Sequence, residues 1–134
     1  NNSHSDVQSL KAGDTLTREL TVTSADGTAS HKVVITIVGA NDAPVLQADV
    51  GAVNEDAILT VNAANGVLAN DSDVDGNTLK VTGILSGTSG TATAVNASGD
   101  TVLTNSYGTL TIRADGSYSF NANGADAQKL AAGQ

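Results

Sequence analysis

Hydrophobic and polar residues alternate with a period of two along most of the chain. In residues 15–24, TLTRELTVTS, the apolar residues share one face with Arg18, and Thr and Glu dominate the other. Residues 32–38, KVVITIV, form a continuous β-branched run, as in a well-buried strand. The turn signal Asp26-Gly27 lies between the two stretches, so we expect a β-hairpin.

The same pattern predicts a second hairpin and several weaker strands. YGTLTIR at 107–113 and SYSF at 117–120 flank another ADG sequence, and the two turns match closely as TSADGT and IRADGS. We therefore interpret Asp26 and Asp115 as turn residues. A short helical turn is expected within 63–69. Weaker strands are expected at 57–62, 78–84, 90–95 and 101–104. Short strands at this spacing predict an all-β, antiparallel β-sandwich.

Composition narrows the classes of protein. The chain has 134 residues, no Cys, no Trp, one Phe and two Tyr, so it can form no disulfide and must build a thin aliphatic core. Acids outnumber bases 14 to 6, and a net charge of −8 repels nucleic acid and attracts cations. No apolar run reaches transmembrane length, and no N-terminal signal pattern is visible. We expect a piece of a longer chain that carries its targeting signals elsewhere.

An internal repeat indicates how the chain is organised. Residues 1–14, NNSHSDVQSLKAGD, align without gaps to 121–134, NANGADAQKLAAGQ. The alignment predicts one repeat unit plus a short overlap, cut out of phase with the domain. The identical pairs are Asn1/Asn121, Asp6/Asp126, Gln8/Gln128, Leu10/Leu130, Ala12/Ala132 and Gly13/Gly133.

The boundary between repeats is expected at GANDAP, residues 39–44, which contains the only proline. Residues 1–40 would then be the C-terminal strands of one repeat, and 41–44 the linker between repeats. Residues 45–134 would be the N-terminal and central strands of the next repeat.

The chemistry concentrates in NDSDVDGN, residues 70–77. Asp71-x-Asp73-x-Asp75-Gly76 matches the first half of a calcium loop, in which alternate carboxylates wrap a hard cation. The glycine permits the turn that brings the carbonyl of Asn77 onto the metal.

An EF-hand does not fit, because its bidentate Glu would fall at Thr82, and the flanking residues predict strands. The remaining ligands must come from elsewhere. Between Asp42 and Asp75 there are seven acids and no base. The alternative is an ordinary solvated turn, with Glu55 and Asp56 also solvated. The candidate calcium ligands are Asp71, Asp73, Asp75, Asn77, Glu55, Asp56, Asn41 and Asp42.

Several motifs together resemble the VCBS or cadherin-like repeat of large bacterial RTX-type adhesins. They are NED at 54–56, GVLANDSDVDGNTLKVTGI at 66–84, YGTLTIRADGSYSF at 107–120, LKAGDTLTRELTVTSADG at 10–27 and ITIVGANDAP at 35–44. The resemblance covers nearly the whole chain. The last two motifs come first here, which agrees with the out-of-phase cut. One departure is REL at 18–20, where the family usually has an aromatic residue.

The resemblance implies an immunoglobulin-like, Greek-key sandwich with Ca²⁺ at domain junctions and loops, secreted to the bacterial surface. By analogy with classical cadherins, Asn41 and Asp42 would be linker ligands, Glu55 the acid at the domain start, and Asp73 and Asp75 the DxD pair. Such modules act as extenders that hold a distal binding domain away from the cell for attachment or biofilm formation.

The residues weigh against an enzyme. His4 and His31 are far apart in sequence, no serine has a recognisable nucleophile setting, and the acid cluster lacks aromatic residues for stacking a sugar. The alternative to a passive extender is a ligand-recognising adhesion module that binds a glycan or protein.

The out-of-phase cut also predicts partners. Residues 1–40 are too short to be stable alone, and 45–134 lack their closing hairpin. Sandwich poles lie roughly 25–40 Å apart, whereas the four residues 41–44 span about 14 Å. We therefore expect neighbouring repeats as the natural partners, and strand exchange or head-to-tail assembly between copies of this chain. No nucleic-acid partner and no membrane insertion are expected.

Overall fold

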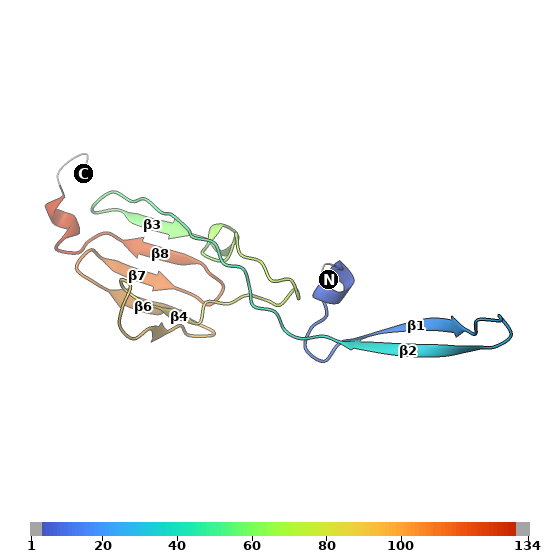
Figure 1. Cartoon of the computed structure of the whole chain (residues 1–134). Helices are drawn as coiled ribbons and strands as arrows, with labels where there is room; N and C mark the ends of the chain where they lie inside the picture. The colour runs from blue at the N-terminus through green and yellow to red at the C-terminus, as the bar shows by residue number, and fades with distance from the viewer. Residues whose placement is uncertain (1–3, 131–134) are drawn as a thin grey trace. The chain divides into compact units, whose positions relative to one another are not determined.

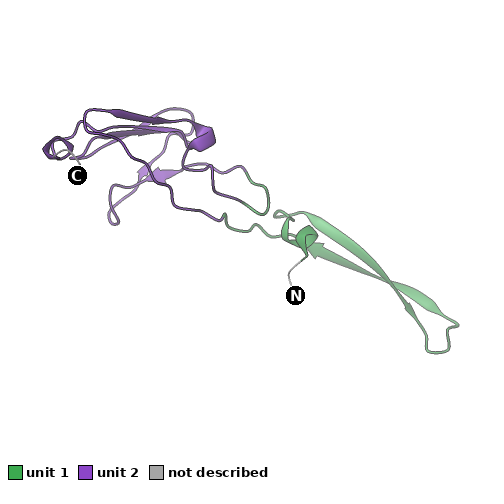
Figure 2. Cartoon of the chain, turned by 90° about the horizontal axis from the view of Figure 1, so that it is seen from above, with its two compact units in different colours: residues 1–44, 73–77 green, residues 45–72, 78–134 purple. Residues whose placement is uncertain are grey.

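The computed structural model describes residues 4–130 and divides the chain into two compact units. The first comprises residues 1–44 with 73–77, and the second comprises 45–72 with 78–134 (Figure 2). Residues 1–3 and 131–134, which include Asn1, Ala132 and Gly133 of the aligned repeat, lie outside the described part.

The first unit contains one helical turn and one long hairpin. The turn is α1 (Ser5–Gln8), and the hairpin pairs β1 (Thr15–Thr23) with β2 (Ser30–Val38). The strands are antiparallel over all nine positions, from Thr15 opposite Val38 to Thr23 opposite Ser30 (Figure 1). The first predicted hairpin is confirmed.

The hairpin has one apolar and one polar face, because neighbouring residues on a strand point to opposite sides. The polar face carries mainly threonines and an exposed ion pair, with Lys32 Nζ 2.8 Å from Glu19 Oε2. The prediction that 32–38 is well buried is wrong, because its side chains are mostly exposed. The other side, termed the hairpin apolar face, carries Leu16, Leu20, Val22, Val33, Ile35 and Ile37, together with Arg18 and His31.

The second unit is built around a four-stranded antiparallel sheet. Its order is β3-β8-β7-β6, and the short strands β4 and β5 form a separate pair (Figure 1). Two 3-10 turns complete the unit, η1 (Ala63–Asn65) and η2 (Ala127–Lys129). The strands are β3 (Ile58–Val61), β4 (Gly83–Ile84), β5 (Thr93–Ala94), β6 (Thr101–Thr104), β7 (Thr109–Ile112) and β8 (Tyr118–Asn121).

The four-stranded sheet also has two chemically distinct faces. Leu59, Phe120, Leu110 and Leu103 lie opposite one another in register across the four strands. The reverse side carries mostly Thr and Ser, as the alternation along each strand requires. The first side, termed the sheet apolar face, carries Leu59, Val61, Leu103, Leu110, Ile112, Tyr118 and Phe120.

The core is thin, as the composition predicts. Among the described residues the buried hydrophobic side chains are Ile112, Ala114, Ala122 and Ala127, and no large side chain is fully buried. Most residues of the sheet apolar face are only half-buried.

Most of the strand predictions are confirmed, including the second hairpin, the strands within 57–62 and at 101–104, and the helical turn within 63–69. The predicted strands at 78–84 and 90–95 are shorter than expected, because they pair only over two residues each. Residue 81 is held instead by a single bond, from the Val81 amide to the carbonyl of Ala114.

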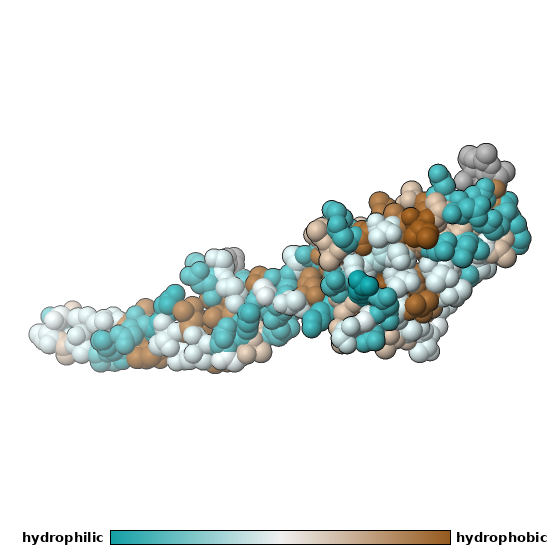
Figure 3. Space-filling view, turned by 180° about the vertical axis from the view of Figure 1, so that it is seen from behind, coloured by the Kyte–Doolittle hydropathy of each residue, from teal (hydrophilic) through white to brown (hydrophobic). Residues whose placement is uncertain are grey.

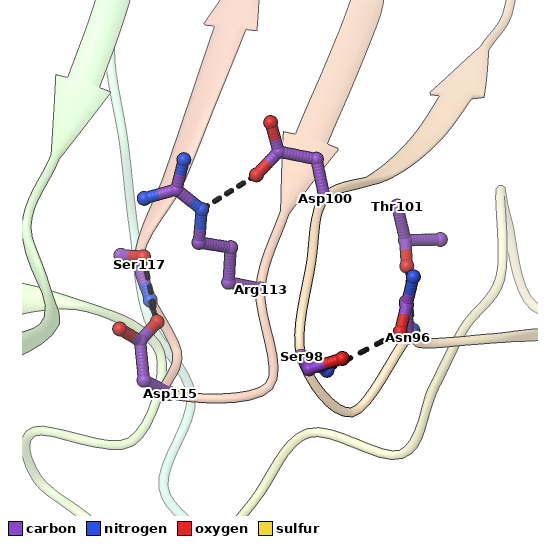
Figure 4. Close-up of polar contacts among 7 residues, drawn as sticks. All are labelled: Asn96, Ser98, Asp100, Thr101, Arg113, Asp115 and Ser117. Carbon is purple, nitrogen blue, oxygen red and sulfur yellow. Dashed lines mark hydrogen bonds and ion pairs between the residues drawn. The ribbon is translucent and has the colours of Figure 1, made fainter.

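The two ADG turns share one hydrogen-bonding scheme, which confirms their interpretation as turns. The Asp26 carboxylate accepts bonds from the Ser24 and Thr28 hydroxyls and the Thr28 amide, and the Asp115 carboxylate accepts from the Ser117 hydroxyl and amide. Figure 4 shows Asp115 and Ser117 in contact. The glycines that come next, at φ +73 and +85, occupy the left-handed region.

Nearby polar contacts brace the same end of the sheet. The Arg113 guanidinium contacts the Asp100 carboxylate, which raises the pKa of Arg113 (Figure 4). The Asn96 amide donates to the hydroxyl of buried Thr101 at 2.7 Å, and Asn96 Oδ1 accepts from the Ser98 amide.

The Asp26 turn makes the first hairpin sensitive to acid. Hydrogen bonds from the Ser24 hydroxyl and then from Thr28 lower the pKa of Asp26 from 3.8 to about 2. A carboxyl group whose pKa is lowered by folding stabilises the folded hairpin at pH values above its ordinary pKa. This stabilisation is lost as the pH falls from about 4 to 2. A pH titration of the Thr28 amide signal by NMR should show a midpoint near 2. Ser24→Ala should raise that midpoint, whereas Ser30→Ala should not; equal midpoints in the two variants would contradict this account.

Backbone crowding makes the fold sensitive to substitution of Gly108. A Cβ there would overlap the carbonyl oxygen of Asn121 and approach Phe120 Cζ to 2.9 Å. Gly108→Ala should lower the free energy of unfolding by about 1–3 kcal/mol, measured by denaturant titration with circular dichroism. Gly83→Ala is the matched control, because its nearest neighbours lie 3.6 Å or more from the added methyl. Equal stability of the two variants would refute the prediction.

Candidate metal centre

Burial alternates along the predicted calcium loop, because the acids are more buried than the residues between them. Asp71, Asp73 and Asn77 are half-buried, Asp75 is buried, and the residues between them are exposed. Residues 73–77 belong to the first unit and are termed the acidic loop.

Asp75 is the most unusual side chain of the acidic loop. Its residue is only 3% exposed. One carboxylate oxygen, Oδ2, accepts a 2.7 Å hydrogen bond from the backbone amide of Asp42. The other, Oδ1, is buried and receives no hydrogen bond from any residue in the described part of the chain. A buried carboxylate oxygen without a partner is costly, so this atom points to a ligand that the protein atoms do not supply.

Two hydrogen bonds from backbone amides to Asp73 close the acidic loop. The carbonyl of Asp73 accepts from the Gly76 amide at 3.0 Å, and Asp73 Oδ1 accepts from the Asn77 amide at 3.1 Å. Gly76 has φ +67, a conformation that an L side chain rarely adopts, so the glycine of the motif is required for the turn.

The linker contacts this loop through side chains and backbone. Asn77 Nδ2 donates to Asn41 Oδ1 at 2.9 Å, and Asn41 Nδ2 donates to the Asp42 carbonyl at 2.7 Å. Together with the bond from Asp42 to Asp75, these contacts bring five of the eight candidate ligands into one cluster. The cluster consists of Asn41, Asp42, Asp73, Asp75 and Asn77.

The other three candidates belong to the second unit. Asp71 Oδ1 accepts from the Gln47 amide at 2.8 Å. Glu55 and Asp56 are exposed. Asp56 has φ +62, and its amide donates to the Ala122 carbonyl near the start of β3, which gives it a structural role. Sequence reasoning missed Gln47, because an isolated glutamine in an extended segment carries no motif.

The donor set suits calcium. All side-chain donors of the cluster that could face a cation are carboxylate or amide oxygens, which a hard cation prefers. Across residues 4–130 no three His, Asp or Glu side chains are gathered closely enough to hold a metal as they stand. Binding would therefore have to draw Asp42 or Asp73 toward the free oxygen of Asp75.

Comparison with known families gives the chain its context. Residues 41–132, more than half of the chain, match the bacterial cadherin-like domain. The chain belongs to this family. The expected all-β architecture is thereby confirmed as the antiparallel, immunoglobulin-type sandwich of a cadherin-like domain. The matched region begins at Asn41, so it includes the whole cluster described above.

A search of curated proteins found no match. Cadherin-like domains of bacteria are adhesin-type repeat modules, with structural rather than catalytic roles, and typically extracellular. Within the described residues, no helix has the length and hydrophobicity needed to cross a bilayer.

The unpartnered oxygen predicts the behaviour of a conservative variant. In chelator, Asp75→Asn should be at least as stable as the native chain, because it removes a buried charge while its side-chain carbonyl still accepts from the Asp42 amide. Asp75→Ala should be less stable than Asp75→Asn, since that amide then loses its acceptor. Thermal melts followed by circular dichroism measure both. If the native chain were much more stable than Asp75→Asn in the absence of calcium, this interpretation of the site would be contradicted.

Proposed function

We propose that this cadherin-like domain is a calcium-binding extender module of a secreted, VCBS- or RTX-type bacterial adhesin, in which Ca²⁺ stiffens a tandem array for surface attachment or biofilm formation. The observation that carries the proposal is the buried, unpartnered Oδ1 of Asp75 beside the linker. It sets the acidic loop apart from an ordinary solvated turn, whose carboxylates face water.

Asp75 and Asp73 would supply carboxylate oxygens, and Asn77 its carbonyl. Asn41 and Asp42 would supply linker oxygens, and Asp71, Glu55 and Asp56 are candidates for further ligands. Because Asn41 and Asp42 lie just before Pro44, an ion held here would also restrict the linker between neighbouring repeats. Calcium supplies the positive charge that a chain of net charge −8 lacks.

Calcium dependence also suits a module that is exported before it folds. At low calcium, repulsion among the acids opposes the compact state. Outside the cell, calcium that binds only the folded state stabilises it by mass action, by about 2.7 kcal/mol at one hundred times the dissociation constant. The thin core gives this increment a large share of the total stability.

The alternative, a ligand-recognising adhesion module, has weaker support. The second unit has a shallow groove of about 430 Å³, lined mainly by Thr, Ser and the charged pair Arg113 and Asp100. Tyr118 is the one aromatic residue that lines it, whereas glycan sites generally use aromatic side chains for stacking. Specific binding of the isolated module on a glycan array would favour the alternative.

The calcium proposal predicts a cation-dependent melting temperature. The native chain should melt at a higher temperature in millimolar calcium than in chelator. Asp73→Asn with Asp75→Asn should abolish this difference, because the loop loses the carboxylates that face the ion. Asp26→Asn with Asp115→Asn is the matched control, since it removes the same charge from turns outside the cluster and should preserve the calcium response.

Scanning calorimetry with calcium, magnesium and chelator measures these shifts. Identical melting temperatures of the native chain in calcium and chelator would rule the proposal out. A calcium response that survives in the Asp73/Asp75 variant would place the ion elsewhere.

A further inference from the structure

The β1–β2 hairpin presents an apolar face with no described layer packed over it. Leu20 and Ile35 are 53% and 45% exposed, and Val22 and Val33 are exposed as well. Figure 3 shows hydrophobic residues at the surface in both units. An isolated two-stranded hairpin is marginal in water even with good turns, so this element needs a second layer to persist.

The sheet of the second unit also has an apolar face that is incompletely covered. Its apolar face is crossed by the segment around Gly51, where a Cβ would lie 3.1 Å from Leu59 Cδ2 and 3.2 Å from Tyr118 Oη. This cover is incomplete, because most of the sheet apolar face stays half-buried and Val45, Leu46 and Val50 of the crossing segment are exposed. A sandwich buries the apolar faces of two sheets against each other, so the exposed part of this face leaves room for a further layer.

The structure supports the internal repeat independently of residue identity. In the aligned segments, the Gln8 amide bonds to the His4 carbonyl and the Gln128 amide bonds to the Gly124 carbonyl, both at 3.1 Å. Similarly, the Leu10 amide donates to the Val7 carbonyl, and the Leu130 amide donates to the Ala127 carbonyl. α1 and η2 thus lie at the same phase of the repeat and share these two hydrogen bonds, although α1 is an α-helical turn and η2 a 3-10 turn.

This equivalence identifies the element that comes after η2 in a complete repeat. In the first unit the helical turn leads directly into β1 and β2. A hairpin of the β1–β2 type is therefore the element that the sheet of the second unit requires at the next position of the repeat.

We propose that the hairpin apolar face of one copy of this chain packs on the sheet apolar face of a second copy, completing its β-sandwich. The inference extends the proposed function by naming the partner of the hairpin. It rests on the repeat organisation within that proposal and not on calcium. The polar face, with its threonines and the Glu19–Lys32 ion pair, stays in water.

A second copy fits better than the same chain. The repeat places the hairpin that covers a sheet after η2, whereas this chain's own hairpin precedes β3, so the covering hairpin comes from another copy. Each copy offers one hairpin and one sheet, and so the contact is head-to-tail and forms rings or open chains.

The sequence offers a matched pair of variants for the test. Val33→Thr with Ile35→Thr alters the hairpin apolar face. Val34→Thr with Val38→Thr makes two comparable changes on the polar face, at residues that are 57% and 66% exposed. Threonine keeps the β-branched shape, so strand propensity is preserved in both.

Light scattering after size exclusion, on the full chain over a range of concentrations, should show masses above that of the monomer. Val33→Thr with Ile35→Thr should weaken this association at least tenfold, and the polar-face pair should leave it unchanged. A discrete monomer at all concentrations would overturn the proposal, as would equal weakening by the two pairs.

Engineered cysteines give a second measurement, which needs no loss of stability. The native chain has no cysteine, so any disulfide is attributable to the engineered pair. Mixing Val33→Cys with Leu110→Cys and oxidising should produce a linked heterodimer. Mixing Val34→Cys with Leu110→Cys should not. A link that forms only within a chain carrying both Val33→Cys and Leu110→Cys would overturn association between copies.

Running both measurements in calcium and in chelator separates this inference from the proposed function. If association and cross-linking persist while the melting temperature is the same in calcium and in chelator, the hairpin contact is supported and calcium binding is refuted. A calcium-stabilised monomer without cross-links would do the reverse.

Discussion

The hydrogen bond from the Asp42 amide to Oδ2 of Asp75 ties the linker to the acidic loop, and the candidate site is built around it. It holds a carboxylate in a position where its other oxygen is buried and unpartnered. The bonds of Asn77 to Asn41 and to Asp73 keep the remaining oxygens of the cluster nearby. The proposed cation would satisfy the free oxygen of Asp75, which no described side chain contacts by a hydrogen bond.

The proposed dependence on a cation fits the shortage of buried hydrophobic volume. Ile112 and three alanines form the buried core, and the larger aliphatic residues of both apolar faces remain partly or largely exposed. Burial at about 25 cal/mol per Å² yields little from so small a core, which leaves the proposed ions and the proposed second copy a large share of the stability. The same shortage links the two proposals, because calcium would stabilise the loop and a second copy would cover the hairpin.

The sequence predicted the hairpins well, because period-two alternation and ADG turns are local signals that need no tertiary context. The bounds of β6 and the place of η1 followed from the same kind of signal. The strands expected at 78–84 and 90–95 shortened because pairing depends on a partner strand at the right distance, which alternation does not report. For the same reason the β-branched run at 32–38 predicted burial that the structure does not show.

For the candidate site, the motif selected the loop that contains the buried carboxylate, but it did not indicate the structural role of each acid. Asp71, Asp73 and Asp75 are equivalent in the pattern, yet Asp71 bonds to Gln47, Asp73 closes the loop and Asp75 is buried. Those differences arise from backbone amides that approach from residues 42 and 47, and spacing within the motif carries no information about them.

Hydrogen exchange of backbone amides, with and without calcium, tests the central claim most directly, because it reports on the loop residue by residue. If Asp75 forms one side of a calcium site, the amides of Asp42, Gly76 and Asn77 should exchange much more slowly in calcium than in chelator. The Thr28 and Ser117 amides, in the two ADG turns, should show the smaller change that global stabilisation gives. Equal exchange at Asp42, Gly76 and Asn77 under both conditions would contradict a calcium site at Asp75.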